Sequence, residues 1–301
     1  MATVTRPQYR EHLSSALTLV FNRQGKRQAV TQSYIFRALG RVARTIGVES
    51  GGIMYFLDPT DVGVSLPIFT NGGFEEELMD EIVAILRRET GRSLAGRGLI
   101  DIGANIGTTT ALAVKRHGAS HVMAFEPESR NYELFRHLLI ANGLEDKVDL
   151  HRAALSDHDG MAVLELATDN SGDHRVRLGV QAPGEMSEEC RKTTSVAVAR
   201  LDSFDLDLAD IGLVWIDVQG HEGHVLAGAS RLLESDVPVV AEYWPYMLNR
   251  AGGLEMFHEL VQRHFRTVID ARTGDRMSAE SVSSLANRYP SPTYTDVILL
   301  H

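Results

Sequence analysis

The stretch that decides the fold is Leu99–Thr109, which reads LIDIGANIGTT. A short apolar segment is followed by a Gly-containing turn and then by a run of threonines. Gly103 and Gly107 let the backbone turn tightly and approach a ligand closely. Asn105 stands where a further Gly would be common, and Asn is among the few non-Gly residues that tolerate a positive φ. The pattern predicts a ligand-binding loop at the carboxyl end of a strand in an open α/β sheet.

The residues on either side of this loop indicate the kind of ligand. Thr108 and Thr109 open the following helix, whose free N–H groups and hydroxyls suit a carboxylate such as that of a methionine moiety. The next strand ends at Glu126-Pro127, about 20 residues after the loop, where an acid can accept hydrogen bonds from both ribose hydroxyls. A nucleoside that carries an amino acid fits both halves of the site, and S-adenosylmethionine is such a molecule.

A dinucleotide-binding loop is the main alternative for this pattern. Its G-x-G-x-x-G motif would require Gly at positions 105 and 108, where the chain has Asn105 and Thr108. The spacing therefore disfavours a nicotinamide cofactor and an NAD-dependent dehydrogenase.

Strands and helices alternate along the rest of the chain. This order predicts parallel strands with right-handed crossovers, hence a doubly wound α/β sheet. We expect strands at residues 98–102, 121–125, 147–153, 213–217, 237–242, 265–269 and 296–300, and helices near residues 75–88, 108–117 and 130–141. Residues 158–205 interrupt the alternation and predict an inserted β-ribbon.

The first part of the chain predicts a separate cap. We expect residues 1 to about 50 to be mainly helical, with an amphipathic helix over Leu13–Phe21, and small strands and turns over Ile53–Phe69. The predicted division is a cap at residues 1–75 and a Rossmann-like domain at residues 76–301 that contains the insertion.

Composition limits the class of protein and its partners. The chain has 301 residues, 44% of them hydrophobic, which is ample for one large domain with a core. A net charge of -10 disfavours nucleic acid and anionic membranes as partners. No apolar run approaches the roughly 20 residues of a membrane span. The single cysteine, Cys190, agrees with a reducing compartment, so we expect a cytoplasmic protein, and we keep a homodimer open.

Several blocks in order resemble the FkbM-like family of S-adenosylmethionine-dependent methyltransferases. They are DIGANIGTTTALA, VMAFEPESRNYELFRHLLIANGL, VDLHRAALSDHDGMAVL, SVAVARLDSF and LVWIDVQGHEGHVLAGA, which together run from about Gly98 to Glu242. The resemblance implies a class I, Rossmann-like fold with a final antiparallel strand. It also implies S-adenosylmethionine as methyl donor and a hydroxyl of a natural product or sugar as acceptor.

The resemblance also implies positions for the cofactor. Ala154 and Leu155 would lie near the adenine, and Phe74 and Glu75 would touch the cofactor. The remaining cofactor-binding residues are expected to be Asp101, Gly103, Ala104, Asn105, Gly107, Thr108, Thr109, Glu126, Pro127 and Asp217. One departure stands at Gln219, because the family usually has D-V-E-G where this chain has Asp217-Val218-Gln219-Gly220.

The end of the fourth predicted strand carries the candidate catalytic groups. A hydroxyl becomes a good methyl acceptor when a nearby base takes its proton. His221 is the first candidate because its intrinsic pKa lies near neutrality, although a capping or packing role is the alternative. Asp217 would orient His221 or bind the cofactor amine, and Glu222 adjoins them. Glu242, which ends the fifth strand, is the second candidate base.

The same segment invites comparison with a metal site. His221-Glu222-Gly223-His224 superficially resembles a zincin helix, but that motif places its two His at i and i+4, and here they stand at i and i+3. Hydroxyl methylation needs no Lewis acid, so we expect no metal.

An aromatic cluster follows Glu242. Tyr243, Trp244 and Tyr246 suit stacking on a sugar or polyketide face, and core packing is an equal alternative. The sequence as a whole predicts a small-molecule O-methyltransferase. An N-methyltransferase and a non-catalytic S-adenosylmethionine-binding protein remain the alternatives.

Overall fold

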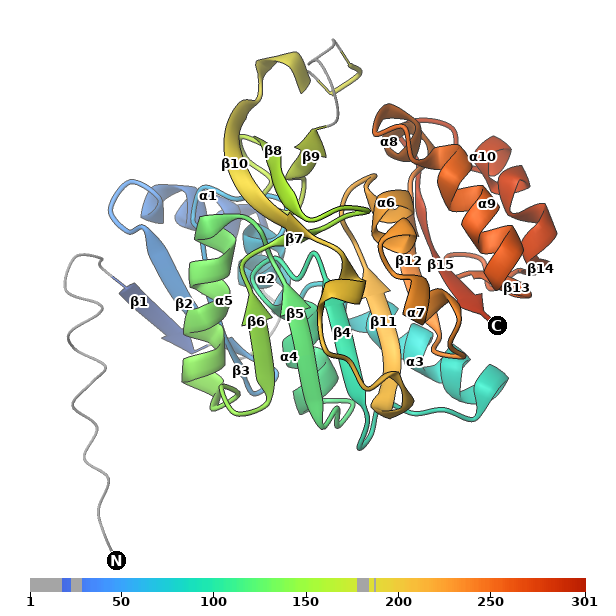
Figure 1. Ribbon diagram of the computed structural model, residues 1–301. Helices are drawn as coiled ribbons and strands as arrows, with labels where there is room; N and C mark the ends of the chain where they lie inside the picture. The colour runs from blue at the N-terminus through green and yellow to red at the C-terminus, as the bar shows by residue number, and fades with distance from the viewer. Residues whose placement is uncertain (1–17, 23–28, 178–183, 187) are drawn as a thin grey trace, which may run out of the picture.

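A computed structural model describes residues 18–22, 29–177, 184–186 and 188–301 (Figure 1). Its centre is an eight-stranded sheet in the order β14-β13-β15-β12-β11-β4-β5-β6. The strands are β4 (Gly98–Ile102), β5 (His121–Phe125), β6 (Val148–His151), β11 (Ile211–Ile216), β12 (Val239–Tyr243), β13 (Thr267–Asp270), β14 (Arg276–Ser278) and β15 (Thr295–Leu300).

The directions of the strands confirm the predicted fold class. β6, β5, β4, β11 and β12 pair in parallel, whereas β15 runs antiparallel between β12 and β13. All seven strands predicted from the sequence are present. The sheet is therefore the doubly wound, Rossmann-like sheet with a final antiparallel strand.

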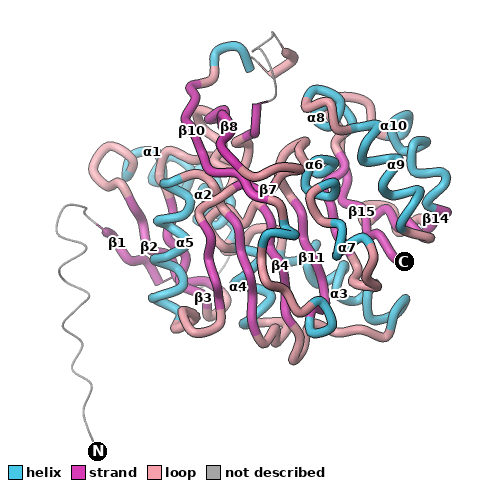
Figure 2. The backbone as a smooth tube through the Cα atoms, in the orientation of Figure 1, coloured by secondary structure: helices cyan, strands magenta, loops and turns pink. Residues whose placement is uncertain are grey.

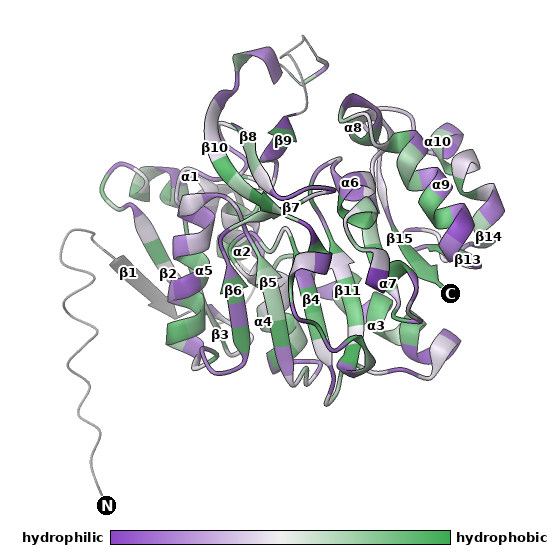
Figure 3. Cartoon of the chain, in the orientation of Figure 1, coloured by the Kyte–Doolittle hydropathy of each residue, from purple (hydrophilic) through white to green (hydrophobic). Residues whose placement is uncertain are grey.

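Helices cover both faces of this sheet because successive strand residues point to opposite sides. In β4, Leu99 packs into one hydrophobic cluster and its neighbour Ile100 into the other. Apolar strands lie between amphipathic helices in Figure 3. The first face carries α3 (Glu76–Thr90), α4 (Thr108–Lys115) and α5 (Ser129–Asn142). The second carries α6 (Glu222–Ala227), α7 (Ser230–Leu233), α8 (Pro245–Arg250), α9 (Leu254–His264) and α10 (Leu285–Arg288).

The N-terminal cap contains more strand than the sequence predicts. Its elements are β1 (Thr18–Asn22), α1 (Ala29–Leu39), β2 (Thr45–Ser50), β3 (Ile53–Leu57) and α2 (Ser65–Asn71), with the sheet order β1-β2-β3 (Figure 2). The amphipathic helix expected over Leu13–Phe21 is wrong from residue 18 onward, and residues 13–17 lie outside the described part. The backbone of β1 pairs along its length with β2, and such pairing between distant segments overrides a local helical pattern.

A second correction concerns Ser65–Asn71, which forms α2 where only small strands and turns were expected. The cause is a carboxylate at the start of this helix. The oxygens of Asp61 accept hydrogen bonds from the N–H groups of Gly63, at 3.0 Å, and Ser65, at 2.7 Å. These bonds satisfy N–H groups that a helix start leaves free.

The predicted ribbon is confirmed and connects to the cap. It contains β7 (Ala154–Leu155), β8 (Gly160–Leu166), β9 (Arg175–Arg177) and β10 (Lys192–Ala199), in the order β7-β10-β8-β9. Ser171, between β8 and β9, donates its N–H and its hydroxyl to Asp61 of the cap at 3.0 and 2.9 Å. Cap and ribbon therefore meet above the central sheet (Figure 1).

Among the helices of the described ranges, none combines the length and the apolar character that crossing a membrane requires.

Candidate active site

The loop between β4 and α4 has the backbone geometry that the sequence predicts. Gly103 has a φ of 86°, and a Cβ atom on it would lie 1.8 Å from the carbonyl oxygen of Asp217. The loop therefore passes against the end of β11 with no room for a side chain. Asn105 has a φ of 51°, as expected for a residue in a Gly-like position. Gly107, with a φ of 89°, precedes α4.

Glu126 lies at the end of β5 and holds this loop in place. One carboxylate oxygen accepts the N–H of Asn105 at 2.9 Å, and the other accepts the N–H of Glu128 at 2.8 Å. Glu126 is 4% exposed, and burial raises its pKa to about 8. A carboxylate has about four lone-pair directions, so two bonds leave acceptor capacity for a ligand.

Two cavities adjoin the loop. The first has a volume of about 50 Å³ and the second about 430 Å³. Both touch Gly103, Asn105, Gly172, Asp217 and Gln219, so these residues mark the junction between the two.

The first cavity is lined by Glu126, Pro127, Ala154 and Leu155, which the sequence predicts to contact the cofactor, together with further apolar residues. Apolar side chains and the acid Glu126 share it, which is a combination suited to a flat base and a ribose. Its lining includes Phe125, Glu126, Pro127, Ala154, Leu155, Leu164 and Val176.

The second cavity is larger and acidic. The cofactor-site predictions Glu75, Asp101, Ala104, Thr108 and Thr109 lie here, together with Phe74, Asp173, Asp217, Glu242 and Trp244. Among the described residues that line either cavity there is no Lys or Arg. The cavity therefore favours neutral or cationic ligands.

Burial and mutual repulsion raise the pKa values of these acids. Burial raises the pKa of Asp101 to about 7, and Thr110 donates a 2.5 Å hydrogen bond to it. Burial, with the nearby charge of Asp217, raises the pKa of Glu75 to about 8. The pKa of Glu242 lies well above its ordinary value, first because of burial and then because of Asp217 and Glu222. A cation bound here would lower these pKa values, because opposite charge favours the carboxylate.

The structure places His221 in the smaller, first cavity. It lines the first cavity, with Glu126 and Leu155, and it does not line the second. Its Nε2 lies 2.9 Å from the Ser156 hydroxyl, and its ring stacks on His224 with centroids 4.5 Å apart. Burial lowers the pKa of His221 to about 3. Burial favours the neutral ring and so makes His221 a weaker proton acceptor near neutrality, and its role as the base stays a prediction.

Glu222 and Glu242 lie in different environments. Glu222 is fully buried at the start of α6, and one of its oxygens accepts the N–H groups of Val218 at 3.1 Å and Gly220 at 3.2 Å. Glu222 therefore supports the loop after β11. Glu242 lies next to the last residue of β12 and lines the second cavity with Asp217, so a ligand in that cavity can reach both of these predicted catalytic acids.

Of the three predicted aromatic contacts, only Trp244 lines the second cavity, where it packs against Tyr294 with ring centroids 5.4 Å apart. Tyr243 is fully buried, and its hydroxyl lies 2.8 Å from His258 Nε2, so it belongs to the core. Tyr246 lines neither cavity, and its hydroxyl donates to Glu188 at 3.0 Å.

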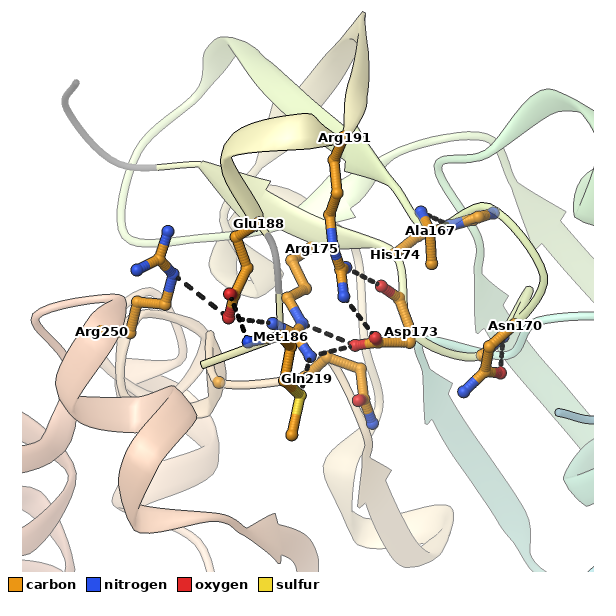
Figure 4. A network of polar contacts seen from close by, with 12 residues as sticks. Ala167, Asn170, Asp173, His174, Arg175, Met186, Glu188, Arg191, Gln219 and Arg250 are labelled. Atoms are coloured by element: carbon orange, nitrogen blue, oxygen red, sulfur yellow. Dashed lines mark hydrogen bonds and ion pairs between the residues drawn. The ribbon is translucent and has the colours of Figure 1, made fainter. Parts of the chain in front are cut away.

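The β-ribbon forms one wall of the second cavity, and the sequence did not predict this contribution. Arg175 is 3% exposed and bonds to Asp173 at 2.5 Å and to Glu188 at 2.9 Å (Figure 4). Arg250 of α8 lies 3.5 Å from Glu188, so this network joins the ribbon to α8. Asn170, Asp173 and Met186 reach the second cavity from this side. The sequence around Asn170 and Asp173 is polar and contains no recognisable motif, so it did not indicate that these residues reach the site.

Three acids, Asp217, Glu222 and Glu242, each place one carboxylate oxygen within 4.8 Å of the others. The amide of Gln219 already bonds to two of them, Asp217 and Glu242. The expectation that no metal takes part stays a prediction.

Known proteins resemble this chain over a segment that contains much of the central sheet and the Gly loop. Residues 101–267 match the family model described as the methyltransferase FkbM domain. The 2-O-methyltransferase NoeI of Sinorhizobium fredii is 26% identical over 155 residues, which cover 48% of this chain and 62% of that protein. The chain thus matches less than two thirds of this relative.

Solved structures align with this chain at lower sequence identity. The methyltransferase FkbM from Methylobacillus flagellatus aligns at 14% identity and a TM-score of 0.42, over 68% of this chain and 43% of that one. The TYW2 protein of M. jannaschii, solved with AdoMet, aligns at 11% identity and a TM-score of 0.41, over 85% and 84% of the two chains. The match to the family model covers more than half of the sequence and includes the Gly loop, Glu126 and the end of β12. The chain belongs to the methyltransferase FkbM domain family.

Proposed function

We propose that this chain is an S-adenosylmethionine-dependent methyltransferase that methylates a hydroxyl of a small molecule, such as a sugar or a polyketide-like compound. The observation that carries the proposal is the junction of the two cavities, where the Gly loop meets Asp217 and Glu242. The 2-O-methyltransferase name of the curated relative supports a hydroxyl acceptor.

The residues present fit the cofactor. Gly103 leaves no space for a Cβ, and the Oδ1 atom of Asn105 is buried with no hydrogen-bond partner among the described residues. The Gly103 contact keeps the loop against Asp217, and the unpartnered oxygen of Asn105 can accept a hydrogen bond from a bound ligand. Glu126 would hold the ribose, and Ala154 and Leu155 would contact the adenine.

The methionine part would lie across the junction. Thr108 and Thr109 at the start of α4 would hold its carboxylate, and Asp101, Asp217 and Glu75 would surround its cationic groups. When bound, the cofactor supplies a methyl group made electrophilic by a sulfonium.

Glu242 is the group that we assign to the acceptor proton. It lines the larger cavity beside Asp217, and Trp244 offers an aromatic surface next to it. A base acts in its ionised form, and the pKa of Glu242 lies well above its ordinary value. We therefore expect kcat/KM to rise with pH through this elevated pKa and to be low in the ordinary carboxylate range.

An assay with S-adenosylmethionine carrying a labelled methyl group tests the proposal. A panel of neutral sugars, polyketide-like alcohols and amines is offered, with and without EDTA. We expect label on a hydroxyl oxygen of at least one acceptor and no effect of EDTA.

Three results would contradict parts of this proposal. Label on nitrogen alone would make the chain an N-methyltransferase. Cofactor binding without transfer to any acceptor would leave a binding protein. Activity that is lost in EDTA and restored by a divalent ion would assign Asp217, Glu222 and Glu242 to a metal.

A further inference from the structure

The loop after β11 has an unusual backbone that is held from two sides. Gln219 has a φ of 55° and Gly220 a φ of 102°. One carboxylate oxygen of Glu222 accepts the N–H groups of Val218 and Gly220, on either side of Gln219. A Cβ on Gly220 would lie 2.7 Å from the backbone of Met247, so α8 closes the other side. A non-Gly residue in the left-handed region costs free energy, and such a conformation persists only where its surroundings enforce it.

This backbone directs one amide toward two carboxylates. Nε2 of Gln219 donates to Oδ1 of Asp217 at 2.7 Å and to Oε2 of Glu242 at 2.9 Å. Asp217 directly follows β11 and Glu242 lies near the end of its parallel neighbour β12, so the two carboxylates repel each other when both are ionised. An amide NH₂ has two N–H groups, which is the number that this bridge needs.

The two hydrogen bonds of this amide occupy one carboxylate oxygen of each acid and leave the other oxygen for a ligand. Asp217 Oδ1 and Glu242 Oε2 accept from the amide, and no donor among the described residues bonds to the second oxygen of either acid. Lys and Arg are absent from the described lining of both cavities, so the amide is the group that bridges the two acids and offsets their repulsion when both are ionised.

We propose that Gln219 is a positioning residue for methyl transfer: its amide bridges Asp217 and Glu242, fixes their separation, and presents the free oxygen of Glu242 to the acceptor. The proposal rests on the proposed function, in which Glu242 takes the acceptor proton. Gln219 itself need not touch a reacting atom.

The test is an infrared titration of the carboxyl groups in the full chain without substrate. Gln219→Met keeps the length of the side chain and removes both donors. We expect the coupled acids to ionise about 1–2 pH units higher, because hydrogen bonds to a carboxylate favour its charged form. Gln219→Glu keeps the shape but adds a like charge, so we expect a shift in the same direction.

A matched control is Gln262→Met, which makes the same substitution at an exposed amide of α9 that donates to the carbonyl of Glu280. We expect it to leave the titration unchanged. In the Glu242→Gln background, Gln219→Met should shift only the single remaining acid.

The kinetic result follows from the titration. The acid limb of kcat/KM should move upward by the same amount in Gln219→Met, which a merely structural role would not produce. Titration curves of both Gln219 variants that coincide with wild type would overturn the proposal. A shifted titration in a chain that methylates no acceptor would instead contradict the proposed function and leave the bridge intact.

Discussion

Replacing Glu242 with Gln lowers kcat by about 10²–10⁴-fold, the range that general base catalysis contributes. The substitution keeps the size of the side chain and removes its ability to take a proton. Glu242 lies in the larger cavity beside Asp217, with an elevated pKa. The cofactor dissociation constant, measured by calorimetry, should change little, because we place the cofactor mainly against other residues.

His221→Ala provides the comparison. His221 is buried against Ser156 in the first cavity, and its low pKa makes it a poor proton acceptor. We expect this variant to keep most of its kcat and to lose cofactor affinity instead. If His221→Ala is inactive while Glu242→Gln stays active, then His221 and not Glu242 is the base. If both variants stay active, catalysis is mainly positioning and solvent takes the proton.

Gly103→Ala destabilises the fold by about 2–5 kcal/mol. About 1–2 kcal/mol comes from a left-handed backbone with a side chain, and about 1–3 kcal/mol from overpacking. The new Cβ would lie 1.8 Å from the carbonyl oxygen of Asp217, which is backbone and cannot rotate away. Chemical denaturation measures the loss of stability.

Gly91→Ala separates the two causes. Gly91 has a φ of 69° at the end of α3, and its new Cβ would meet nothing within 4 Å. It should lose only the backbone part, about 1–2 kcal/mol, and should keep its cofactor affinity. In Gly103→Ala the affinity for the cofactor should fall roughly tenfold or more. The new side chain displaces the binding loop, and a loss of about 1.4 kcal/mol in binding free energy already weakens binding tenfold. Equal stability and affinity in the two variants would show that the close approach at Gly103 is unimportant.

The central sheet and its cofactor loop could be predicted from the sequence because their signals are local. Buried strands read as short apolar runs, and Gly103, Asn105 and Gly107 stand where the backbone needs positive φ. Gly143, with a φ of 63°, ends α5 close to the predicted end at residue 141. The cap could not be predicted in the same way, because β1 is a strand only through its pairing with β2.

The roles of individual site residues depend on packing that a sequence does not show. His221 and Glu242 both lie near the carboxyl ends of strands, yet His221, at the start of α6, lines the first cavity and Glu242 lines the second. Gln219 is visible in the sequence only as a substitution in a motif. Its bridge depends on a left-handed backbone that Glu222 holds from the next helix. Asp173 and Met186 reach the cavity through an insertion whose placement no local pattern indicates.

Equilibrium binding of S-adenosylmethionine tests the central claim most directly. Isothermal titration calorimetry with the full chain should give a micromolar dissociation constant for S-adenosylmethionine and for its demethylated product, and no binding of NAD. The Gly loop with Asn105 and Glu126 is the reason for this expectation. Tight binding of NAD, with no binding of S-adenosylmethionine or its product, would contradict the account.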